Sequence, residues 1–279
     1  MTGKLIIVGT PIGNLNDFSF RAIEALKSVD FIAAEDTRVT LKLLNHFEIK
    51  KPLVSYYEHN QKTRGDFICQ KILNGETCAL VSDAGMPAIS DPGEKLVSLC
   101  YENNIPVTTV PGPSALTAAL AISGLPTGRF TFEGFLSVNK KSRREHLLSL
   151  QNETRTMIFY EAPHKLLNTL KDLQEILGDR EISIVRELTK IHEEVIRTSL
   201  SKACEDYEKK PLKGEIVLIV NGAKAFQNDA KSYDMSDALE FVKDAINDGK
   251  STSEATKIAA KITNISKSEI YRAFISVEN

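Results

Sequence analysis

The chain has few of the residues that mark disulfide scaffolds, zinc sites and disordered proteins. Its 279 residues include only four cysteines, which stand far apart with no Cys-x-x-Cys pair. This usage predicts reduced, mostly buried thiols in a cytosolic protein and leaves no ligand spacing for a structural zinc ion. Glycine and proline together account for 25 residues (15 + 10), which is too few for extensive disorder.

Long apolar runs and an excess of one charge are also missing. No run of 18 or more apolar residues occurs, so we expect no membrane span. The apolar run near the N-terminus is too short for a signal peptide, and we expect a cytoplasmic protein. The net charge is −2, from 35 Lys and Arg against 37 Asp and Glu. Any contact with nucleic acid must therefore come from local patches.

Short apolar runs alternate with amphipathic segments in the first part of the chain. Runs without polar alternation, separated by helical patterns, are typical of a parallel sheet covered on both faces. They predict a first α/β domain at residues 1–112. The expected strands are Leu5–Val8, Phe31–Ala34, Leu53–Val54, Cys78–Val81 and Val107–Val110.

The alternation restarts after a helix of small residues at 116–125. Several strand candidates then follow one another directly, which predicts a mixed sheet in a second α/β domain at residues 113–224. The expected strands are Phe130–Phe135, Thr156–Tyr160, Ile182–Arg186, Val195–Ser199 and Glu215–Val220, with helices near 144–150 and 166–177.

The last part of the chain has helical patterns only. A polar stretch at 221–233 predicts a linker, and residues 234–279 predict a small helical domain. Ser251 with Glu254, and Ser266 with Glu269, each fit a capping box at a helix start. The two helices resemble a helix-turn-helix pair, and they also fit a helical cap over a domain face.

Ligands of open α/β sheets bind at the loops that follow the strands, and two of these loops have unusual sequences. Gly9–Asn14 lacks the dinucleotide pattern G-x-G-x-x-G and also fits a plain tight turn. Ser82–Gly93 is too elaborate for a simple connection, and a glycine within it lets the backbone approach a ligand closely. Asp83 and Asp91 are hydrogen-bond acceptors there. Asp91 also fits a helix N-cap followed by a proline at the first helical position.

A third loop, Val110–Ala115, joins a strand to the helix of small residues. Pro113 fits the start of that helix, where Ser114 and Ala115 place free amides at its positive end. Such amides bind a carboxylate or a ribose oxygen. In the second domain, clusters of titratable side chains follow two of the expected strands. These clusters also fit ordinary solvated loops.

Five motifs occur together, in this order, in one known family. They are GTPIGNL at 9–15, SDAGMPAISDPG at 82–93, VPGPSA at 110–115, EAPHK at 161–165 and RELTK at 186–190. From about residue 4 to 220 the chain resembles the small-subunit ribosomal RNA cytidine-2′-O-methyltransferases, which are members of the tetrapyrrole methylase superfamily. The resemblance implies S-adenosylmethionine in the cleft between two α/β domains, a homodimer, and 16S ribosomal RNA or the 30S subunit as substrate.

Carried over by position, the resemblance implies a donor pocket built from both domains. Asp83 matches an acidic residue of the donor loop, and Tyr160 matches a pocket residue of the second domain. His164 and Lys165 stand where His-Arg is more familiar, which keeps the charge but loses the bidentate fork. The implied donor-binding residues are Pro11, Asp83, Gly85, Met86, Ser114, Ala115, Tyr160 and Glu215.

A ribose hydroxyl is a poor nucleophile, so its methylation calls for a proton acceptor and a cation that stabilises the alkoxide. The candidates are Glu187 and Lys190, with His192 and Glu161 behind them. Lys190 also fits a structural ion pair with Glu187 or Glu193. This chemistry needs no metal ion.

For RNA contact the sequence offers one basic patch. It consists of Lys140, Lys141, Arg143 and Arg144, which also fit the start of an ordinary solvated helix. Residues 225–279 carry seven Lys and Arg against nine Asp and Glu, so charge does not favour RNA binding there. Two rival functions remain: a tetrapyrrole-ring C-methyltransferase, and a non-catalytic RNA-binding or ribosome-assembly factor.

Overall fold

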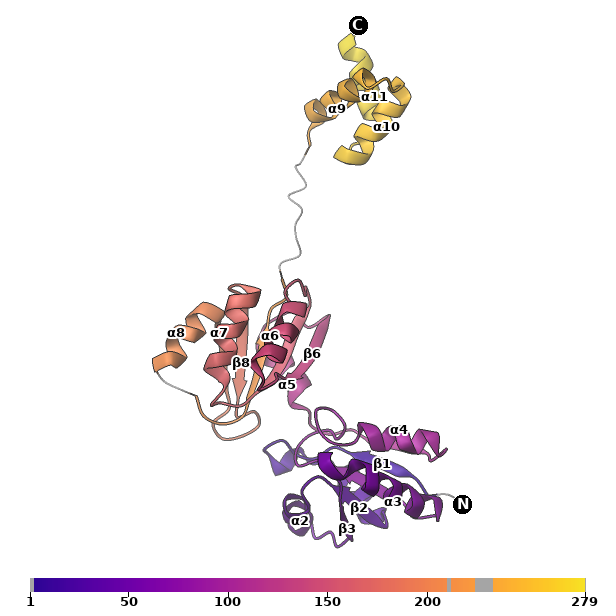
Figure 1. The fold of residues 1–279 in the computed structure, drawn as a ribbon, viewed down its shortest axis with the longest axis vertical. Helices are drawn as coiled ribbons and strands as arrows, with labels where there is room; N and C mark the ends of the chain where they lie inside the picture. The colour runs from indigo at the N-terminus through magenta and orange to yellow at the C-terminus, as the bar shows by residue number, and fades with distance from the viewer. Residues whose placement is uncertain (1–2, 210–211, 224–232, 279) are drawn as a thin grey trace. The chain divides into compact units, whose positions relative to one another are not determined.

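The chain divides into two compact units, Met1–Ala223 and Lys224–Asn279. The computed structural model describes residues 3–209, 212–223 and 233–278, and Figure 1 shows its helices and strands. Most of the predicted linker at 221–233 lies outside the described residues. No helix within the described ranges is long and apolar enough to cross a membrane.

The first sheet is parallel, as the apolar runs predict, with strand order β3-β2-β4-β1-β5. Its strands are β1 (Leu5–Val8), β2 (Phe31–Ala34), β3 (Leu53–Ser55), β4 (Cys78–Val81) and β5 (Val107–Val110). The connecting helices are η1 (Leu15–Asp17), α1 (Phe20–Ser28), α2 (Thr37–His46), η2 (Glu58–Asn60), α3 (Gln61–Leu73) and α4 (Glu94–Glu102).

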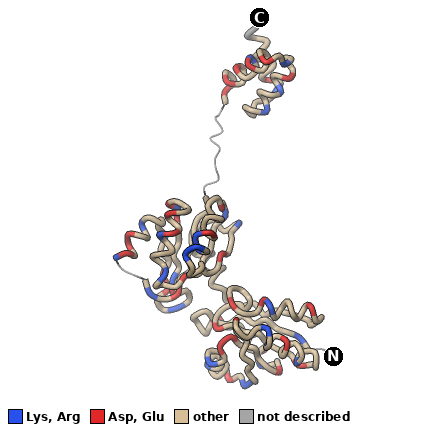
Figure 2. Tube along the Cα trace, viewed as in Figure 1, with Lys and Arg blue, Asp and Glu red and all other residues tan. Residues whose placement is uncertain are grey.

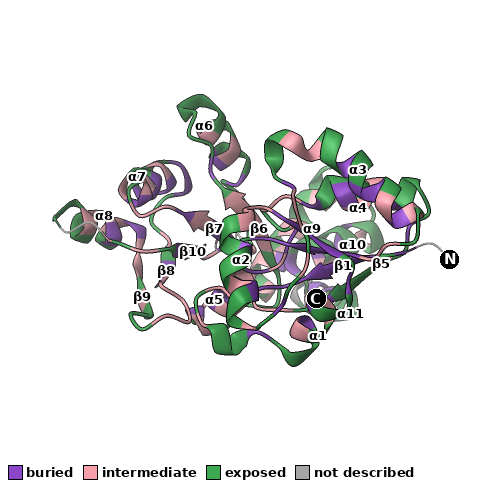
Figure 3. Ribbon diagram, turned by 90° about the horizontal axis from the view of Figure 1, so that it is seen from below, coloured by how far each residue is buried: buried purple, intermediate pink, exposed green. Residues whose placement is uncertain are grey.

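Helices cover both faces of this sheet, because successive strand side chains point to opposite sides. Leu5 and Ile7 pack in a cluster with α3 and α4, whereas Ile6 and Val8 pack in a cluster with α1 and α2. Figure 3 shows β1 as buried and the outer faces of the helices as exposed. Because the strands are parallel, their carboxyl ends lie at one edge of the sheet, and the loops that follow them lie close together.

The second sheet is mixed, again as predicted, with strand order β6-β7-β10-β8-β9. β6 and β7 are parallel, and the other neighbours are antiparallel. The strands are β6 (Phe130–Phe135), β7 (Thr156–Glu161), β8 (Glu181–Arg186), β9 (Glu194–Ser199) and β10 (Ile216–Val220). One face packs against α5 (Ala115–Ser123), and the other against α6 (Lys140–Ser149), α7 (Leu166–Leu177) and α8 (Leu200–Lys209).

Several expected helix boundaries are wrong. Asp91 is not an N-cap, because α4 begins at Glu94 with Gly93 in the N-cap position. α5 begins at Ala115 with Ser114 as its N-cap, so Pro113 precedes the helix. α6 begins at Lys140 rather than near residue 144, because the side chain of Asn139 caps its first amides. The sequence pattern also failed to predict α8.

The C-terminal unit contains three helices within its described residues: α9 (Met235–Asn247), α10 (Thr252–Thr263) and α11 (Lys267–Glu278). Their shared core includes Val242, Ala259 and Phe274. α10 begins with the predicted capping box of Ser251 and Glu254. α9 packs against the expected helix pair, so the unit is larger than a helix-turn-helix pair alone.

Candidate active site

Three loops at the strand ends of the first sheet are locked together by close backbone contacts. Thr10 and Gly85 exchange two backbone hydrogen bonds of 2.9 and 3.1 Å. A Cβ atom added at Gly9 would lie 2.7 Å from the Cα atom of Gly112, closer than any side chain permits. The Gly112 amide donates a hydrogen bond to the sulfur of Met86 at 3.3 Å. Glycine at positions 9 and 112 therefore allows the three loops to meet.

The long loop between β4 and α4 has an unusual backbone. Ala88 and Ser90 have φ angles of 69° and 63°, in the left-handed region that non-glycine residues seldom adopt. Such strain persists where surrounding contacts fix the chain, and it is common at ligand-binding sites. These two φ angles make the loop a candidate ligand-binding segment.

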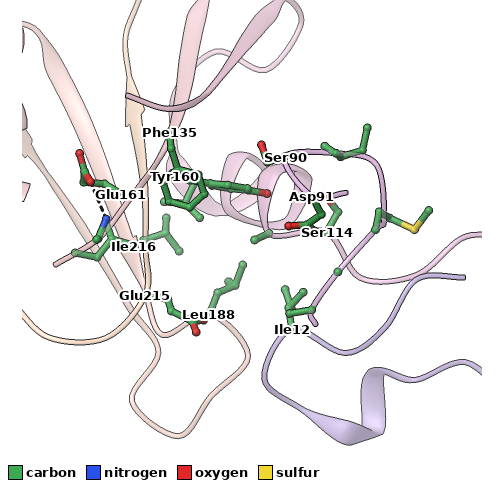
Figure 4. Close-up of a pocket in the computed structure, with 18 of the residues that line it drawn as sticks. Ile12, Ser90, Asp91, Ser114, Phe135, Tyr160, Glu161, Leu188, Glu215 and Ile216 are labelled. Carbon is green, nitrogen blue, oxygen red and sulfur yellow. Dashed lines mark hydrogen bonds between the residues drawn. The ribbon is translucent and has the colours of Figure 1, made fainter. Parts of the chain in front are cut away.

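A cavity of about 400 Å³ lies next to these loops, with walls from both α/β domains. In Figure 4, Ile12, Asp91 and Ser114 face Tyr160 and Leu188 across it. Of the predicted donor-binding residues, those that line it are Gly85, Met86, Ser114, Ala115, Tyr160 and Glu215. Pro11 and Asp83 are outside the lining.

The lining is apolar with a few polar groups. Ile12, Leu188 and Ile216 supply apolar surface, and the Ser114 side chain makes no capping hydrogen bond. The Tyr160 hydroxyl accepts a hydrogen bond of 3.1 Å from the Leu116 amide, which fixes the start of α5 beside the second sheet. An apolar cavity with few oriented polar groups is typical of a small-molecule site.

Carboxylates gather behind the cavity. Asp83 accepts a 3.1 Å hydrogen bond from the Asp36 amide, so this side chain joins two strand-end loops of the first sheet. Burial, with repulsion from Asp83, raises the pKa of Asp91 to about 6. Burial likewise raises the pKa of Asp83 and of Glu35. Asp91, which lines the cavity, therefore changes charge near pH 6.

The catalytic candidates of the second domain form one ion cluster. The Lys190 ammonium lies 3.0 Å from a Glu187 carboxylate oxygen and 3.1 Å from one of Glu215. Burial lowers the pKa of Lys190, but its hydrogen bonds to both carboxylates raise it overall. The Glu215 amide and Lys190 lower the pKa of Glu187. Lys190 therefore stays protonated and Glu187 ionised.

The other two candidates are in different places. Glu161 lines the cavity but is buried, and it accepts hydrogen bonds from the Thr169 hydroxyl and the Ala162 amide. His192 lines a neighbouring groove together with Glu187 and Lys190. Of the two ion pairs expected as alternatives for Lys190, the one with Glu187 forms, whereas Glu193 instead accepts a 2.6 Å hydrogen bond from the Thr189 amide.

The predicted basic patch lies on α6. Arg143, with 18% of its side chain exposed, pairs with Asp172 of α7 at 2.6 Å, and Arg144 pairs with Glu175 at 2.7 Å. These two arginines connect α6 to α7, whereas Lys140 and Lys141 are exposed, with the Lys141 ammonium 4.0 Å from Glu145. Figure 2 shows acidic and basic residues mixed over the chain.

Sequence reasoning missed the apolar lining residues. Ile12 and Leu188 fall within the family motifs but look like ordinary core residues in sequence. Ile216 begins a buried strand, and its place at the cavity follows from the order of strands in the second sheet. Only the position of each motif at a strand end could have suggested them.

Comparisons with known proteins identify the family. Residues 4–204 match the Tetrapyrrole (Corrin/Porphyrin) Methylases. The chain belongs to this family. Tetrapyrrole methylases of known structure share the fold: uroporphyrin-III C-methyltransferase of Thermus thermophilus, complexed with S-adenosylhomocysteine, has a TM-score of 0.56 at 20% identity over 78% of this chain and 97% of that chain. The methyltransferase CobJ has a TM-score of 0.60 at 19% identity over 80% and 95%.

The curated relatives are much more similar in sequence. A protein of Synechocystis is 45% identical over 99% of both chains, and one of Bacillus subtilis is 45% identical over 98% of this chain and 94% of its own. One of Thermotoga maritima is 53% identical over 79% of this chain and 99% of its own. All three are named ribosomal RNA small subunit methyltransferase I.

Proposed function

We propose that this tetrapyrrole methylase transfers a methyl group from S-adenosylmethionine to the ribose 2′-hydroxyl of a cytidine in small-subunit ribosomal RNA. The observation that carries the proposal is its 45% identity, over nearly the full chain, to relatives named for that RNA. The cytidine 2′-hydroxyl as acceptor rests on the motif resemblance. The same resemblance supports a homodimer in the cytoplasm, and light scattering would test the dimer.

The cavity residues fit the proposed donor. Ile12, Leu188 and Ile216 offer apolar surface to an adenine ring, while Ser114 and Asp91 offer partners for hydroxyl and amino groups. When bound, the donor supplies a methyl group on a sulfonium, whose S–C bond breaks with the electron pair left on sulfur. The site therefore has to align the ribose oxygen, which contributes about 7–11 kcal/mol in favourable cases.

The cluster around Lys190 supports the acceptor step. The ribose oxygen forms a bond to the methyl carbon as its own proton leaves, and negative charge develops on that oxygen. Lys190, held protonated by Glu187 and Glu215, is suited to stabilise this charge. Glu187 has a lowered pKa, so we assign it the positioning of Lys190. His192 lines the same groove, and we assign its imidazole ring the role of accepting the proton that leaves the ribose oxygen.

One assay tests the proposed function. The protein is incubated with methyl-labelled donor and either unmethylated small subunits or free ribosomal RNA, and the labelled nucleotide is mapped. We expect a 2′-O-methylated cytidine. Label on a tetrapyrrole but not on RNA would identify a ring methyltransferase, and RNA binding without label would identify a non-catalytic factor.

The raised pKa of Asp91 predicts that donor binding depends on pH. S-adenosylmethionine carries a net positive charge, and Asp91 becomes negative only as the pH rises through about 6. We expect calorimetry to show about tenfold tighter donor binding at pH 7.5 than at pH 5, because the ionised carboxylate favours the cation.

S-adenosylhomocysteine is the matched control ligand, because it lacks the sulfonium charge. Its affinity should change little over the same range, and Asp91→Asn should remove most of the pH dependence seen with the cationic donor. An unchanged pH dependence in the variant would show that another group is responsible.

The exposed lysines of α6 predict a salt-dependent contact with RNA phosphates. We expect the double variant Lys140→Ala/Lys141→Ala to reduce the slope of log affinity against log salt by about 1.4–1.8, because each lost contact accounts for about 0.7–0.9. Filter binding of small-subunit RNA over a salt series measures this slope. Lys50→Ala/Lys51→Ala, a consecutive pair in the first domain, is the control, and equal slopes for the two double variants would contradict the assignment.

A further inference from the structure

A groove of about 690 Å³ lies beside the donor cavity and has a different lining. Its walls come from residues 13–16 and His46 of the first domain and from the loop at 187–192 of the second. Asn14, Asn16, His46 and His192 contribute amide and imidazole groups, which both donate and accept hydrogen bonds. This chemistry matches the edges of a nucleobase better than it matches an apolar ligand.

Two exposed aliphatic side chains lie among these polar groups. Ile191 is 97% exposed and Leu15 is 42% exposed, and both line the groove. The loop that carries Ile191 is held by backbone hydrogen bonds, from the Lys190 amide to Glu187 and from the Glu193 amide to Lys190. A fixed loop with an exposed apolar side chain provides an apolar contact for the face of an unstacked base.

The groove and the donor cavity share the same two loops. Ile12 and Leu188 line the cavity, and their neighbours Gly13 and Thr189 line the groove. The loops touch at this point, since a Cβ atom added at Gly13 would lie 2.7 Å from the Cγ atom of Lys190. A group bound in the groove therefore lies next to the donor site.

One polar atom at this junction lacks a partner. The hydroxyl oxygen of Thr189 is buried and has no hydrogen bond among the described residues. Thr189 and Glu187 also have positive φ angles of 65° and 52°. Buried polar groups are nearly always hydrogen-bonded in the absence of a functional reason. A Cβ atom added at Gly13 would lie 2.8 Å from this oxygen, so the first-domain loop covers it, whereas Lys190, with 29% of its side chain exposed, can reach a ligand oxygen.

We propose that this groove holds a single unpaired nucleotide of the RNA, with its base against Ile191 and its ribose directed to Lys190. The proposal rests on the proposed function and deepens it, because it requires the acceptor nucleotide to leave any helix before methylation. Base-paired RNA cannot present one base to a groove between two protein loops. Ile191 is therefore a substrate-positioning residue.

The experiment uses Ile191→Ala in the full-length protein. The side chain is almost fully exposed, so its loss leaves the core unchanged. We expect KM for unmethylated small subunits, or for free ribosomal RNA if that is the substrate, to rise about tenfold, in the range of base-contact effects. The affinity for S-adenosylmethionine, measured by calorimetry, should be unchanged.

Tyr101→Ala is the control, since Tyr101 is a 69% exposed apolar side chain on α4 and lines neither the cavity nor the groove. A KM for Ile191→Ala equal to that of Tyr101→Ala would overturn the nucleotide groove and leave the proposed function intact. Absence of ribose methylation by the wild-type protein on both substrates would overturn the proposed function, and the groove assignment with it.

Discussion

Replacing Lys190 by methionine is expected to lower kcat by about 100- to 1000-fold, the range seen when one group that stabilises a developing oxyanion is removed. Lys190 is held between Glu187 and Glu215 at 3.0 and 3.1 Å, and both contacts keep it charged. Methionine retains most of the length of the side chain without the charge. The rate of methyl transfer is measured under single-turnover conditions with saturating RNA and donor.

The affinity for the donor should change little in this variant, because Lys190 lies outside the lining of the donor cavity. Lys190→Arg keeps the charge with a different geometry and should recover part of the lost rate. Lys202→Met is the matched control, since Lys202 also pairs with two carboxylates, Glu205 and Asp206, but on the surface of α8. A rate for Lys190→Met within threefold of this control would remove Lys190 from the reaction.

Much of the fold could be predicted from the sequence because buried parallel strands leave a plain signal. Leu5–Val8 and Cys78–Val81 are continuous apolar runs, and in the structure all their residues are buried. α8 was missed although Leu200, Ala203, Cys204 and Tyr207 follow helical spacing and pack on the core of the second sheet. The helix follows β9 without a break, so no turn residue separates the two patterns.

The candidate site was harder to predict because its contacts join distant positions. Several of the motifs lie in loops that line the cavity, but the roles of single residues depend on where the chain turns. Asp91 and the proline after it look like a helix start, yet the chain continues to Gly93, whose φ angle of 154° brings it against Ala88. The pairing of Lys190 with Glu215 depends on the order of β8 and β10 in the sheet.

Gly112→Ala is expected to disrupt the donor site through the addition of a single methyl group. The new Cβ atom would lie 2.8 Å from the backbone carbon atoms of Gly9 and 2.9 Å from the Gly9 oxygen. Backbone atoms cannot rotate away as a side chain does, so the loops after β1 and β5 must separate. Overpacking of this kind costs about 1–3 kcal/mol of stability.

The separation should also weaken donor binding. The Gly112 amide donates a hydrogen bond to Met86, and Ser114 stands two residues after Gly112; both Met86 and Ser114 line the cavity. We expect calorimetry to show at least a tenfold loss of S-adenosylmethionine affinity, about 1.4 kcal/mol, and a urea melt to show the lost stability. Gly128→Ala is the matched control, because nothing lies within 4 Å of a Cβ atom there. If the two alanine variants bound the donor equally well, the contact between the Gly9 and Gly112 loops would not be what shapes the cavity.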